Sequence, residues 1–367
     1  MPLEYYPPVT NMLNCLGEIA DLHIKVWTTK NVKRRPAYKN TNIAQVQRLK
    51  LPKPQDAKLY RLLTYLRFNI KTFWDLLFFS PDVVLYYESY SAGPVYWYFR
   101  YFGKNKKLFI HYHEYFDQAW YNRGMAIVKQ YYKYEKEFLW HRAQWISHTN
   151  TFRRDLLLKA YPLLQESKIH VLPNYPPSSW YKKVKYKSSR ISKVVKTVYV
   201  GSLSLKDTFI KPYCDWLLSQ NGNVILDVYA YNLHKDTLKY LKQLRSPFIR
   251  FFEDGLAYED LPKVLPKYDI GLILYKGNTP NYIYNAPNKL FEYMACGLEV
   301  WVPQVMIGCQ PYLNIKERPI VRTVDYTNLN NQLLIDYHNH LKLPIKPSSY
   351  NCDTSLLALI QALKQPL

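Results

Sequence analysis

The chain alternates short apolar runs with longer stretches in which apolar residues recur at helical spacing. The apolar runs are typical of buried strands and occupy residues 23–28, 46–51, 81–87, 107–112, 145–149, 168–174, 197–201, 224–229, 249–252, 268–275 and 298–302. The helical stretches fall mainly between them, at residues 9–19, 58–79, 92–102, 125–139, 150–159, 235–244, 289–296 and 355–363. Buried strands that alternate with helices indicate parallel, doubly wound sheets, so we expect an α/β fold.

Two segments near the amino terminus add detail to this pattern. Residues 1–8 look like the end of a first strand that runs into its loop. In the helical stretch 58–79, apolar side chains gather on one side at i,i+3 and i,i+4 spacing. They are Leu59, Leu62, Leu63, Leu66 and Ile70.

The segment 286–303, A-P-N-K-L-F-E-Y-M-A-C-G-L-E-V-W-V-P, organises the second half of the chain. Asn285 can cap a helix, and Pro287 suits the first turn, where a missing N–H costs nothing. Gly297 suits the left-handed residue that ends a helix. We therefore predict a short helix that enters from a polar loop and leads directly into a buried strand.

One face of this predicted helix carries chemistry. Lys289, Glu292 and Cys296 share that face at i,i+3 and i,i+4 spacing. The first backbone N–H groups and the positive end of the helix dipole suit a phosphate group. Glu292 lies one turn further along, where it could accept hydrogen bonds from sugar hydroxyls. The alternative is an ordinary amphipathic helix between two strands, with Glu292 in solvent.

The run P-N-K-L-F-E-Y-M-A-C-G-L resembles the nucleotide-sugar-binding motif of GT-B glycosyltransferases of the family 4, or group 1, type. The resemblance implies that Glu292 binds the ribose, and that Pro287, Asn288 and Lys289 lie against the diphosphate of the donor. The run departs from the motif at two positions. Glu299 stands where the family usually has proline, and Tyr284 stands where it often has a second acidic residue that faces the donor.

Other segments resemble the same family less closely. The family pattern V-G-R-L-x-x-x-K-G corresponds here to V-G-S-L-S-L-K-D, in which Gly201 fits and Lys206 stands one position early. The resemblance implies that Gly201 lets the backbone approach a phosphate and that Lys206 helps to neutralise it. The backbone around Leu256 and Tyr258 would hold the base of the nucleotide.

In the first half of the chain, the run F-I-H-Y-H-E-Y-F ends the predicted strand 107–112. Ligand sites in parallel sheets lie beyond the carboxyl ends of the strands, where this run places His113 and Glu114. The resemblance implies that His113 faces the donor sugar. A structural role for both residues is the alternative. A metal site would need three or four converging ligands, and only this His-x-His-Glu run is visible.

The resemblance implies a GT-B fold, in which two Rossmann-like doubly wound domains face each other across a cleft. We expect an acceptor-side domain at 1–178, a basic linker at 179–196 and a nucleotide-sugar-binding domain at 197–350. A final helix at 351–367 would pack back on the first domain.

The net charge of +22 is unevenly distributed. Nearly all of the excess lies in residues 1–196, which invites an anionic partner such as nucleic acid or a membrane face. We favour an anionic membrane surface and expect no nucleic acid to bind; a basic surface that only aids solubility is the alternative. The candidate membrane contacts are Lys104, Lys106, Lys107, Arg123, Lys129, Lys133 and the linker residues Lys182, Lys183, Lys185 and Lys187.

The five cysteines are scattered and form no C-x-x-C pair, which predicts neither a disulfide framework nor a zinc site. No apolar run approaches the roughly 18–20 residues that span a bilayer. No secretory signal opens the chain, so we expect a cytoplasmic protein, peripheral at the inner face of the cell membrane. No D-x-D motif is present, so we expect neither a catalytic metal nor a cofactor.

The resemblance implies transfer of a sugar from a nucleotide diphosphate donor to an acceptor hydroxyl, with retention of configuration. His113, Lys206 and Lys289 are the predicted catalytic residues. The acceptor would be a saccharide, lipid-linked, in the synthesis of a surface polysaccharide. Two alternatives remain: a catalytically inactive relative that still binds nucleotide, and a basic nucleic-acid-binding protein.

Overall fold

The computed structural model describes residues 2–19, 22–30, 37–39, 45–50, 56–183, 194–231 and 233–365. The chain divides into two compact units. Unit 1 comprises residues 1–173 and 353–367, and unit 2 comprises residues 174–352. No helix among the described residues is long and apolar enough to cross a membrane.

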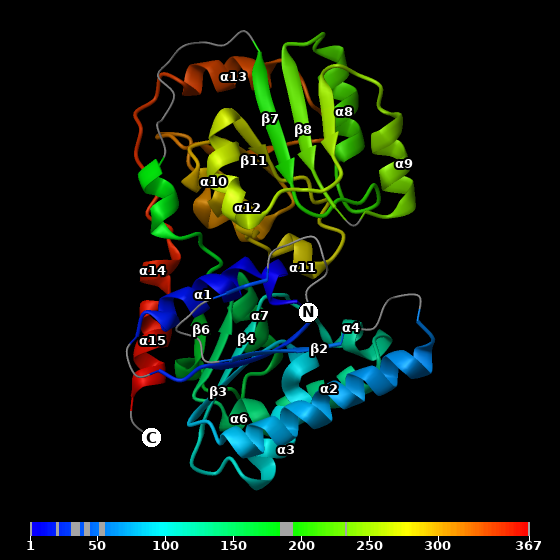
Figure 1. Ribbon diagram of the computed structural model, residues 1–367. Helices are drawn as coiled ribbons and strands as arrows, with labels where there is room; N and C mark the ends of the chain where they lie inside the picture. The colour runs from blue at the N-terminus through cyan, green and yellow to red at the C-terminus, as the bar shows by residue number, and fades with distance from the viewer. Residues whose placement is uncertain are drawn as a thin grey trace. The chain divides into compact units, whose positions relative to one another are not determined.

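Unit 1 contains a four-stranded parallel sheet in the order β3-β4-β5-β6 (Figure 1). Its strands are β3 (Val83–Tyr87), β4 (Lys107–Tyr112), β5 (Trp145–His148) and β6 (Ile169–Val171). A separate parallel pair is formed by β1 (Lys25–Thr29) and β2 (Gln45–Leu49). Every residue of β4 and β5 is buried, as expected for strands covered on both faces.

The helices of unit 1 connect these strands. They are α1 (Pro7–Gly17), α2 (Lys58–Phe79), α3 (Ala92–Tyr101), α4 (Gln118–Arg123), α5 (Ala126–Tyr134), α6 (Trp140–Arg142), α7 (Thr151–Ala160), α14 (Cys352–Ser355, which begins at the last residue of unit 2) and α15 (Leu357–Lys364). Short helical turns are η1 (Leu3–Tyr5), η2 (Ser89–Ser91), η3 (Glu135–Leu139) and η4 (Glu166–Lys168).

Two expectations for unit 1 are confirmed in part. The expected end of a first strand at residues 1–8 is reduced to one parallel bridge, between Pro2 and Thr29, and the chain then turns through η1 into α1. Prolines 7 and 8 favour this outcome because they lack the N–H groups that a strand needs and suit the first turn of a helix. The expected helix at 125–139 is present, since α5, η3 and α6 follow one another without a break, but its middle part, η3, is a π-helical turn.

The π-helical turn coincides with a buried carboxylate. Glu135 is fully buried and accepts hydrogen bonds from the hydroxyl groups of Tyr86, Tyr112 and Ser89, at 2.8, 2.7 and 2.5 Å. Burial raises the pKa of Glu135 to about 7. A π-turn inserts one residue into a helix, which here aims this side chain inward at the sheet.

Unit 2 contains a six-stranded parallel sheet in the order β12-β11-β10-β7-β8-β9. The strands are β7 (Val195–Val200), β8 (Val224–Tyr229), β9 (Ile249–Phe252), β10 (Ile270–Leu272), β11 (Glu299–Pro303) and β12 (Val321–Val324). The chain order reverses between β7 and β10. Ligands in open α/β sheets bind at such a switch point, beyond the carboxyl ends of the two strands.

The helices of unit 2 cover this sheet. They are α8 (Ile210–Ser219), α9 (Lys235–Gln243), α10 (Leu261–Val264), α11 (Pro280–Ile283), α12 (Asn288–Ala295) and α13 (Gln332–His340). Short turns are η5 (Ser178–Lys183), η6 (Tyr258–Asp260), η7 (Leu265–Lys267) and η8 (Ile307–Tyr312). The predicted linker, 179–196, is described only at its two ends, in η5 and at the start of β7.

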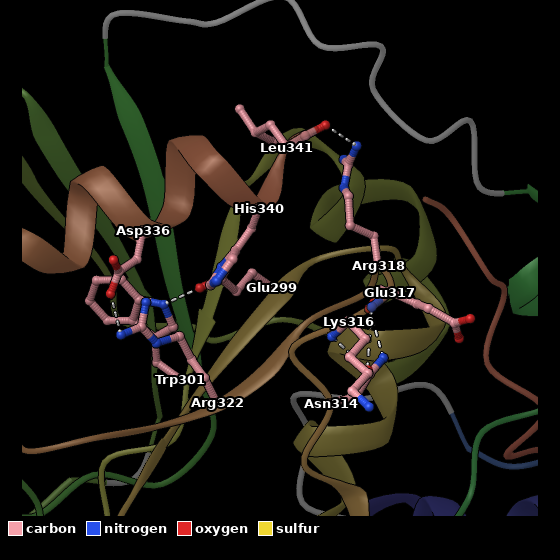
Figure 2. A network of polar contacts seen from close by, with 10 residues as sticks. All are labelled: Glu299, Trp301, Asn314, Lys316, Glu317, Arg318, Arg322, Asp336, His340 and Leu341. Atoms are coloured by element: carbon pink, nitrogen blue, oxygen red, sulfur yellow. Dashed lines mark hydrogen bonds and ion pairs between the residues drawn. The ribbon is translucent and has the colours of Figure 1, made fainter. Parts of the chain in front are cut away.

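Glu299, the residue that replaces the expected proline, is buried in a polar network (Figure 2). One carboxylate oxygen accepts a hydrogen bond from the indole of Trp301 at 2.8 Å. The other lies 2.8 Å from Nδ1 of His340. An ion pair between Arg322 and Asp336, at 2.8 Å, joins β12 to α13, the helix that also carries His340. Glu299 therefore ties the strand that follows α12 to the outer part of unit 2.

We expect Glu299→Ala to lower the free energy of unfolding by about 2–4 kcal/mol, because the buried indole of Trp301 and the half-buried imidazole of His340 lose their acceptor. Glu299→Gln keeps one acceptor oxygen and should lose less. The control is Glu317→Ala: this side chain is 39% exposed and pairs with Lys346, so its loss should cost less than about 1 kcal/mol. Urea denaturation measures all three, and equal losses for the two alanine variants would contradict a stabilising network.

Candidate functional site

Helix α12 lies at the switch point of unit 2, and all of its residues from Lys289 to Ala295 are buried. The structure places its N-cap two positions later than predicted. Pro287 is the N-cap residue, with extended backbone angles, and Asn288 is the first residue of the helix. Asn285 does not cap α12; its carbonyl oxygen instead accepts a hydrogen bond from the thiol of Cys309. The left-handed Gly297, with φ of 78°, ends the helix as predicted.

Lys289 has an unusual environment for a lysine. Its side chain is buried, and Nζ lies 4.2 Å from the centre of the Tyr199 ring and 5.0 Å from that of Tyr275. Within the described part of the chain, no acceptor forms a hydrogen bond with this amino group. Burial lowers the pKa of Lys289 to about 7, while the nearby charge of Glu292 opposes that shift. Two aromatic faces compensate a buried ammonium only in part, so an anion at this point would be bound favourably.

Gly201, at the end of β7, borders this amino group. Its φ of 122° is one that side chains rarely adopt, and a Cβ here would lie 3.3 Å from Nζ of Lys289. Glycine therefore leaves the amino group accessible from the backbone side of the loop. The hydroxyl of Tyr293, on α12, accepts a hydrogen bond from the N–H of Val200 at 3.0 Å, which fixes the end of β7 against the helix.

The close approach of α12 to the sheet depends on a second glycine. A Cβ at Gly271 of β10 would come within 2.3 Å of the Tyr293 ring. Tyr293 is fully buried, so its ring has no room to move away. The helix therefore packs directly against the backbone of β10.

Glu292 is buried, one turn beyond Lys289, as the spacing predicted. Cys296 follows one turn after Glu292. Its pKa is raised mainly by burial and to a smaller extent by the nearby charge of Glu292. Lys289, Glu292 and Cys296 therefore share one face of α12. This face combines a cation, a carboxylate and a helix N-terminus, which is a set that matches the phosphate and hydroxyl groups of a nucleotide.

The other predicted residues of unit 2 lie in loops. Lys206 is exposed, and its side chain makes no hydrogen bond or ion pair among the described residues, although Asn278 donates a hydrogen bond to its backbone carbonyl. Leu256 and Tyr258 are half-buried after the left-handed Gly255, and the Tyr258 ring packs on Trp180.

Tyr284 is half-buried and directly follows α11, a short helix within the loop that we expected to be irregular. Thr279 caps this helix by accepting a hydrogen bond from the N–H of Tyr282. The backbone of Tyr284 and Asn285 packs so tightly on Gly308 that a Cβ there would lie 2.5 Å away. The segment that enters α12 is thus held by contacts on both sides.

In unit 1, polar residues gather at the carboxyl ends of β3, β4 and β5, among them His113 and Glu114. His113 is buried, and its ring stacks on Tyr87 at 5.2 Å and lies 5.3 Å from the ring of Tyr6. Arg153 is fully buried, donates a hydrogen bond to the carbonyl of His113 and lies 3.6 Å from the carboxylate of Glu114. His113 is therefore held in one position by its backbone and its ring.

The sequence reading missed Glu88, which immediately follows β3. Its carboxylate accepts hydrogen bonds from the backbone N–H groups of His113 at 2.7 Å and Glu114 at 3.1 Å. Its φ of 62° is unusual for a residue with a side chain. Burial, and then the charge of Glu114, raise the pKa of Glu88 to about 8. His113 was singled out because sites lie beyond the carboxyl ends of strands. Glu88 follows the carboxyl end of β3, so the same rule could have identified it.

The histidines of the His-x-His-Glu run contact other side chains of unit 1 and each other. His111 Nδ1 lies 2.8 Å from the hydroxyl of Ser147, and its ring meets that of His113 edge to face. Within either unit, the described residues bring no three His, Cys, Asp or Glu side chains close enough to hold an ion.

No family model and no curated protein sequence matches the chain. Solved structures, in contrast, share its fold over nearly its whole length. A sucrose-phosphate synthase from Thermosynechococcus elongatus has a TM-score of 0.68 at 14% identity, covering 97% of this chain and 92% of that one. Anabaena HepE in complex with UDP has a TM-score of 0.62 at 11% identity, covering 93% and 99%. A UDP-GlcNAc 2-epimerase from Neisseria meningitidis bound to UDP-GlcNAc has a TM-score of 0.58 at 11% identity, covering 98% and 96%.

These structures confirm the predicted fold class: the chain is α/β, with two Rossmann-like units, and has the fold of GT-B glycosyltransferases. The same fold is present in an epimerase. Activity therefore has to be argued from the residues of the site.

We expect Lys289→Met to raise the free energy of unfolding at pH 7 by on the order of 2–4 kcal/mol, because the unfolded chain keeps lysine protonated to about pH 10.4 and folding must remove that proton or bury the charge. The gain over wild type should shrink toward pH 10, where the unfolded chain also loses the proton.

Denaturant titrations between pH 7 and 10 measure this difference. Lys206→Met is the matched control, since that lysine is exposed, and it should change stability little at any pH. A loss of stability in Lys289→Met at pH 7 would contradict the costly burial of this charge.

Proposed function

We propose that the chain transfers a sugar from a nucleoside diphosphate donor to an acceptor hydroxyl. The observation that carries the proposal is Lys289: a buried amino group with no acceptor among the described residues, beside a left-handed glycine at the switch point of the sheet. A diphosphate supplies the missing anion. HepE in complex with UDP and an epimerase bound to UDP-GlcNAc, both of this fold, support a nucleotide sugar as the ligand class.

In this proposal each predicted donor residue has a separate task. Lys289, Gly201 and the first turn of α12, from Pro287 and Asn288, hold the diphosphate. Glu292 accepts hydrogen bonds from the ribose hydroxyls. The backbone at Leu256 and Tyr258 holds the base, and Tyr284 borders the sugar. Lys206 reaches the diphosphate from its exposed loop.

The difficult step is departure of the diphosphate. The bond between the anomeric carbon and the β-phosphate oxygen breaks and its electron pair goes to the phosphate. The acceptor hydroxyl bonds to the anomeric carbon and passes its proton to the departing phosphate oxygen. A cation that is already desolvated stabilises the developing negative charge strongly. Lys289 and the N-terminus of α12 supply that positive charge, so we propose that the reaction needs no metal, and that it proceeds with retention.

The acceptor we propose is a lipid-linked saccharide in surface polysaccharide synthesis, met at the cytoplasmic face of a membrane. The basic surface of unit 1 supports this, with one correction to the candidate contacts. Lys107 is buried and bonds to the carbonyl groups of Ala362 and Gln365, so it is not available to lipid. Lys106 pairs with Asp82, and Lys104, Arg123, Lys129 and Lys133 are exposed. Of the linker lysines, Lys182 and Lys183 are described only by their backbone in η5, and Lys185 and Lys187 lie outside the described residues.

The first prediction of this proposal concerns nucleotide affinity. Glu292→Ala should weaken binding of UDP or GDP by roughly ten- to a hundredfold, since a hydrogen bond to a charged group contributes about 1.5–3 kcal/mol. Wild-type affinity should fall as the pH rises from 7 to 9, because the free enzyme then loses the ammonium of Lys289 that the diphosphate requires. Calorimetry across this pH range measures both effects.

Lys289→Met is the control for the pH effect, and it should bind UDP or GDP weakly at every pH. Glu299→Gln, which leaves α12 intact, controls for general damage to unit 2. Equal affinity in wild type and Glu292→Ala would remove Glu292 from the nucleotide site.

The second prediction concerns turnover. Mass spectrometry of reactions with UDP-, GDP- and other nucleotide sugars distinguishes transfer, hydrolysis and epimerisation. We expect transfer or slow hydrolysis that persists in EDTA. His113→Ala should lower the rate at least tenfold and leave nucleotide affinity nearly unchanged, since His113 belongs to unit 1 and the nucleotide residues to unit 2.

Other outcomes separate the alternatives. Nucleotide binding without turnover would favour an inactive relative, and tight, salt-sensitive binding of DNA or RNA without nucleotide binding would favour a nucleic-acid-binding protein. Epimerised donor would place the chain with the 2-epimerases. Activity lost in EDTA and restored by Mg²⁺ would contradict the role of Lys289. A His113→Ala variant with a normal rate would return His113 to a structural role.

A further inference from the structure

Helix α2 packs one side on the core of unit 1 and exposes a second apolar side. The residues buried on its inner side are Asn69, Thr72 and Leu76. Five large apolar residues on the opposite side are between 53% and 83% exposed: Leu59, Leu63, Ile70, Trp74 and Phe78. They follow one another at spacings of four and seven residues, so they form one stripe along the helix. The helical spacing seen in the sequence thus marks an outward-facing surface.

The exposed stripe continues onto the end of α3. Trp97, Tyr101 and Phe102 are between 42% and 66% exposed. The ring of Phe73 links the two helices, since its centre lies 5.8 Å from that of Trp74 and 6.2 Å from that of Phe102. Figure 1 shows α2 as a long helix along the outside of unit 1, with α3 beside it. We call the eight exposed residues of the two helices, Leu59, Leu63, Ile70, Trp74, Phe78, Trp97, Tyr101 and Phe102, the aromatic face.

Positive charge borders this surface. Arg67 and Lys71 are exposed, and their helical positions place them beside Leu63, Ile70 and Trp74. Lys58 and Arg61 add two more exposed cations at the start of α2.

Negative charge is almost absent from the same helix. Asp75 is the one acidic residue of α2, and its carboxylate accepts a hydrogen bond from the indole of Trp27 at 3.1 Å, away from the exposed stripe. The surface thus combines exposed aromatic and aliphatic side chains with unopposed positive charge.

This charge pattern decides between occupants. A second copy of the chain on the same surface would bring Arg67 and Lys71 against their own equivalents, with no acidic residue of α2 to pair them. An anionic bilayer offers both complements at once: acyl chains for the apolar stripe and headgroup charges for the cations. Tryptophan and tyrosine also favour the boundary between headgroups and acyl chains.

We propose that the aromatic face of α2 and α3 lies in the surface layer of an anionic membrane, with α2 parallel to the bilayer plane. A helix of this length would lie along the surface for roughly 33 Å. The proposal deepens the membrane association that forms part of the proposed function, and it rests on that part alone. It differs from the association expected from the charges at residues 104–133, because binding includes insertion of apolar side chains and not only attraction between charges.

The test is cosedimentation of the full chain with vesicles of phosphatidylcholine, alone or with about a third of phosphatidylglycerol, at low and high salt. Wild type should bind the anionic vesicles and keep part of that binding at high salt, since apolar insertion is not screened. Ile70→Ser/Trp74→Ser/Phe78→Ser should bind at least about tenfold more weakly and lose the salt-resistant part. Arg67→Glu/Lys71→Glu should lose most of the preference for anionic vesicles.

The matched control is Leu163→Ser, which removes an apolar side chain of unit 1 that is 90% exposed and lies outside the aromatic face. It should bind as wild type does. Circular dichroism and UDP calorimetry on every variant keep folding and the nucleotide site separate from docking. Vesicle binding without any transferase activity would leave this inference standing and contradict the proposed function. Transferase activity without vesicle binding would contradict this inference and leave the proposed transfer reaction standing.

Three results would overturn the inference. The first is equal vesicle binding by wild type and the triple serine variant. The second is vesicle binding that disappears entirely at high salt, which would leave charge alone as the cause. The third is a wild-type chain that binds no vesicle but is a dimer in size-exclusion chromatography, with the triple serine variant monomeric, which would assign the surface to a second copy.

Discussion

The candidate donor site depends on the burial of one short helix on every side. A helix of eight residues contributes little stability by itself, so α12 is held by what surrounds it. Its own carboxyl end runs through Gly297 into a strand whose five residues are all buried. Burial at this level forces the two charged residues of the helix out of water as well. Burial of these two charges is unfavourable for folding, and the same two charges are the groups that the site offers to a ligand.

The sequence predicted the parts of this arrangement that local patterns determine. Apolar runs located most strands of both sheets, and the left-handed glycine after α12 was identified from its position alone. The surroundings of Lys289 were not predictable in this way. Tyr199 lies on β7 and Tyr275 follows β10, and only the order of strands in the sheet brings their rings to the same amino group. Strand order is a long-range property that no window of sequence contains.

Other differences have equally specific causes. The π-helical turn at 135–139 follows from the partners of one buried carboxylate, which lie on β3, β4 and η2. Glu88 belongs to a strand end whose position was predicted, yet its role depends on backbone N–H groups that carry no side-chain signal. Strand β12 and helix α13 were not predicted because their hydrophobic pattern is weak. Side-chain pairs in the network around Glu299 hold these elements in place instead.

The packing of Tyr293 against Gly271 limits which substitutions this protein can tolerate. Position 271 lies within β10, and because a Cβ there would come within 2.3 Å of the Tyr293 ring, it determines how closely α12 packs on the sheet. A random substitution there would shift Lys289 and Glu292 together, and it would be found in a genetic screen as a loss of activity with no contact to explain it. The exposed loops around Lys206 and Tyr258 carry no such constraint. Changes of donor preference through laboratory evolution should therefore accumulate in those loops, while Gly271 and Tyr293 stay paired.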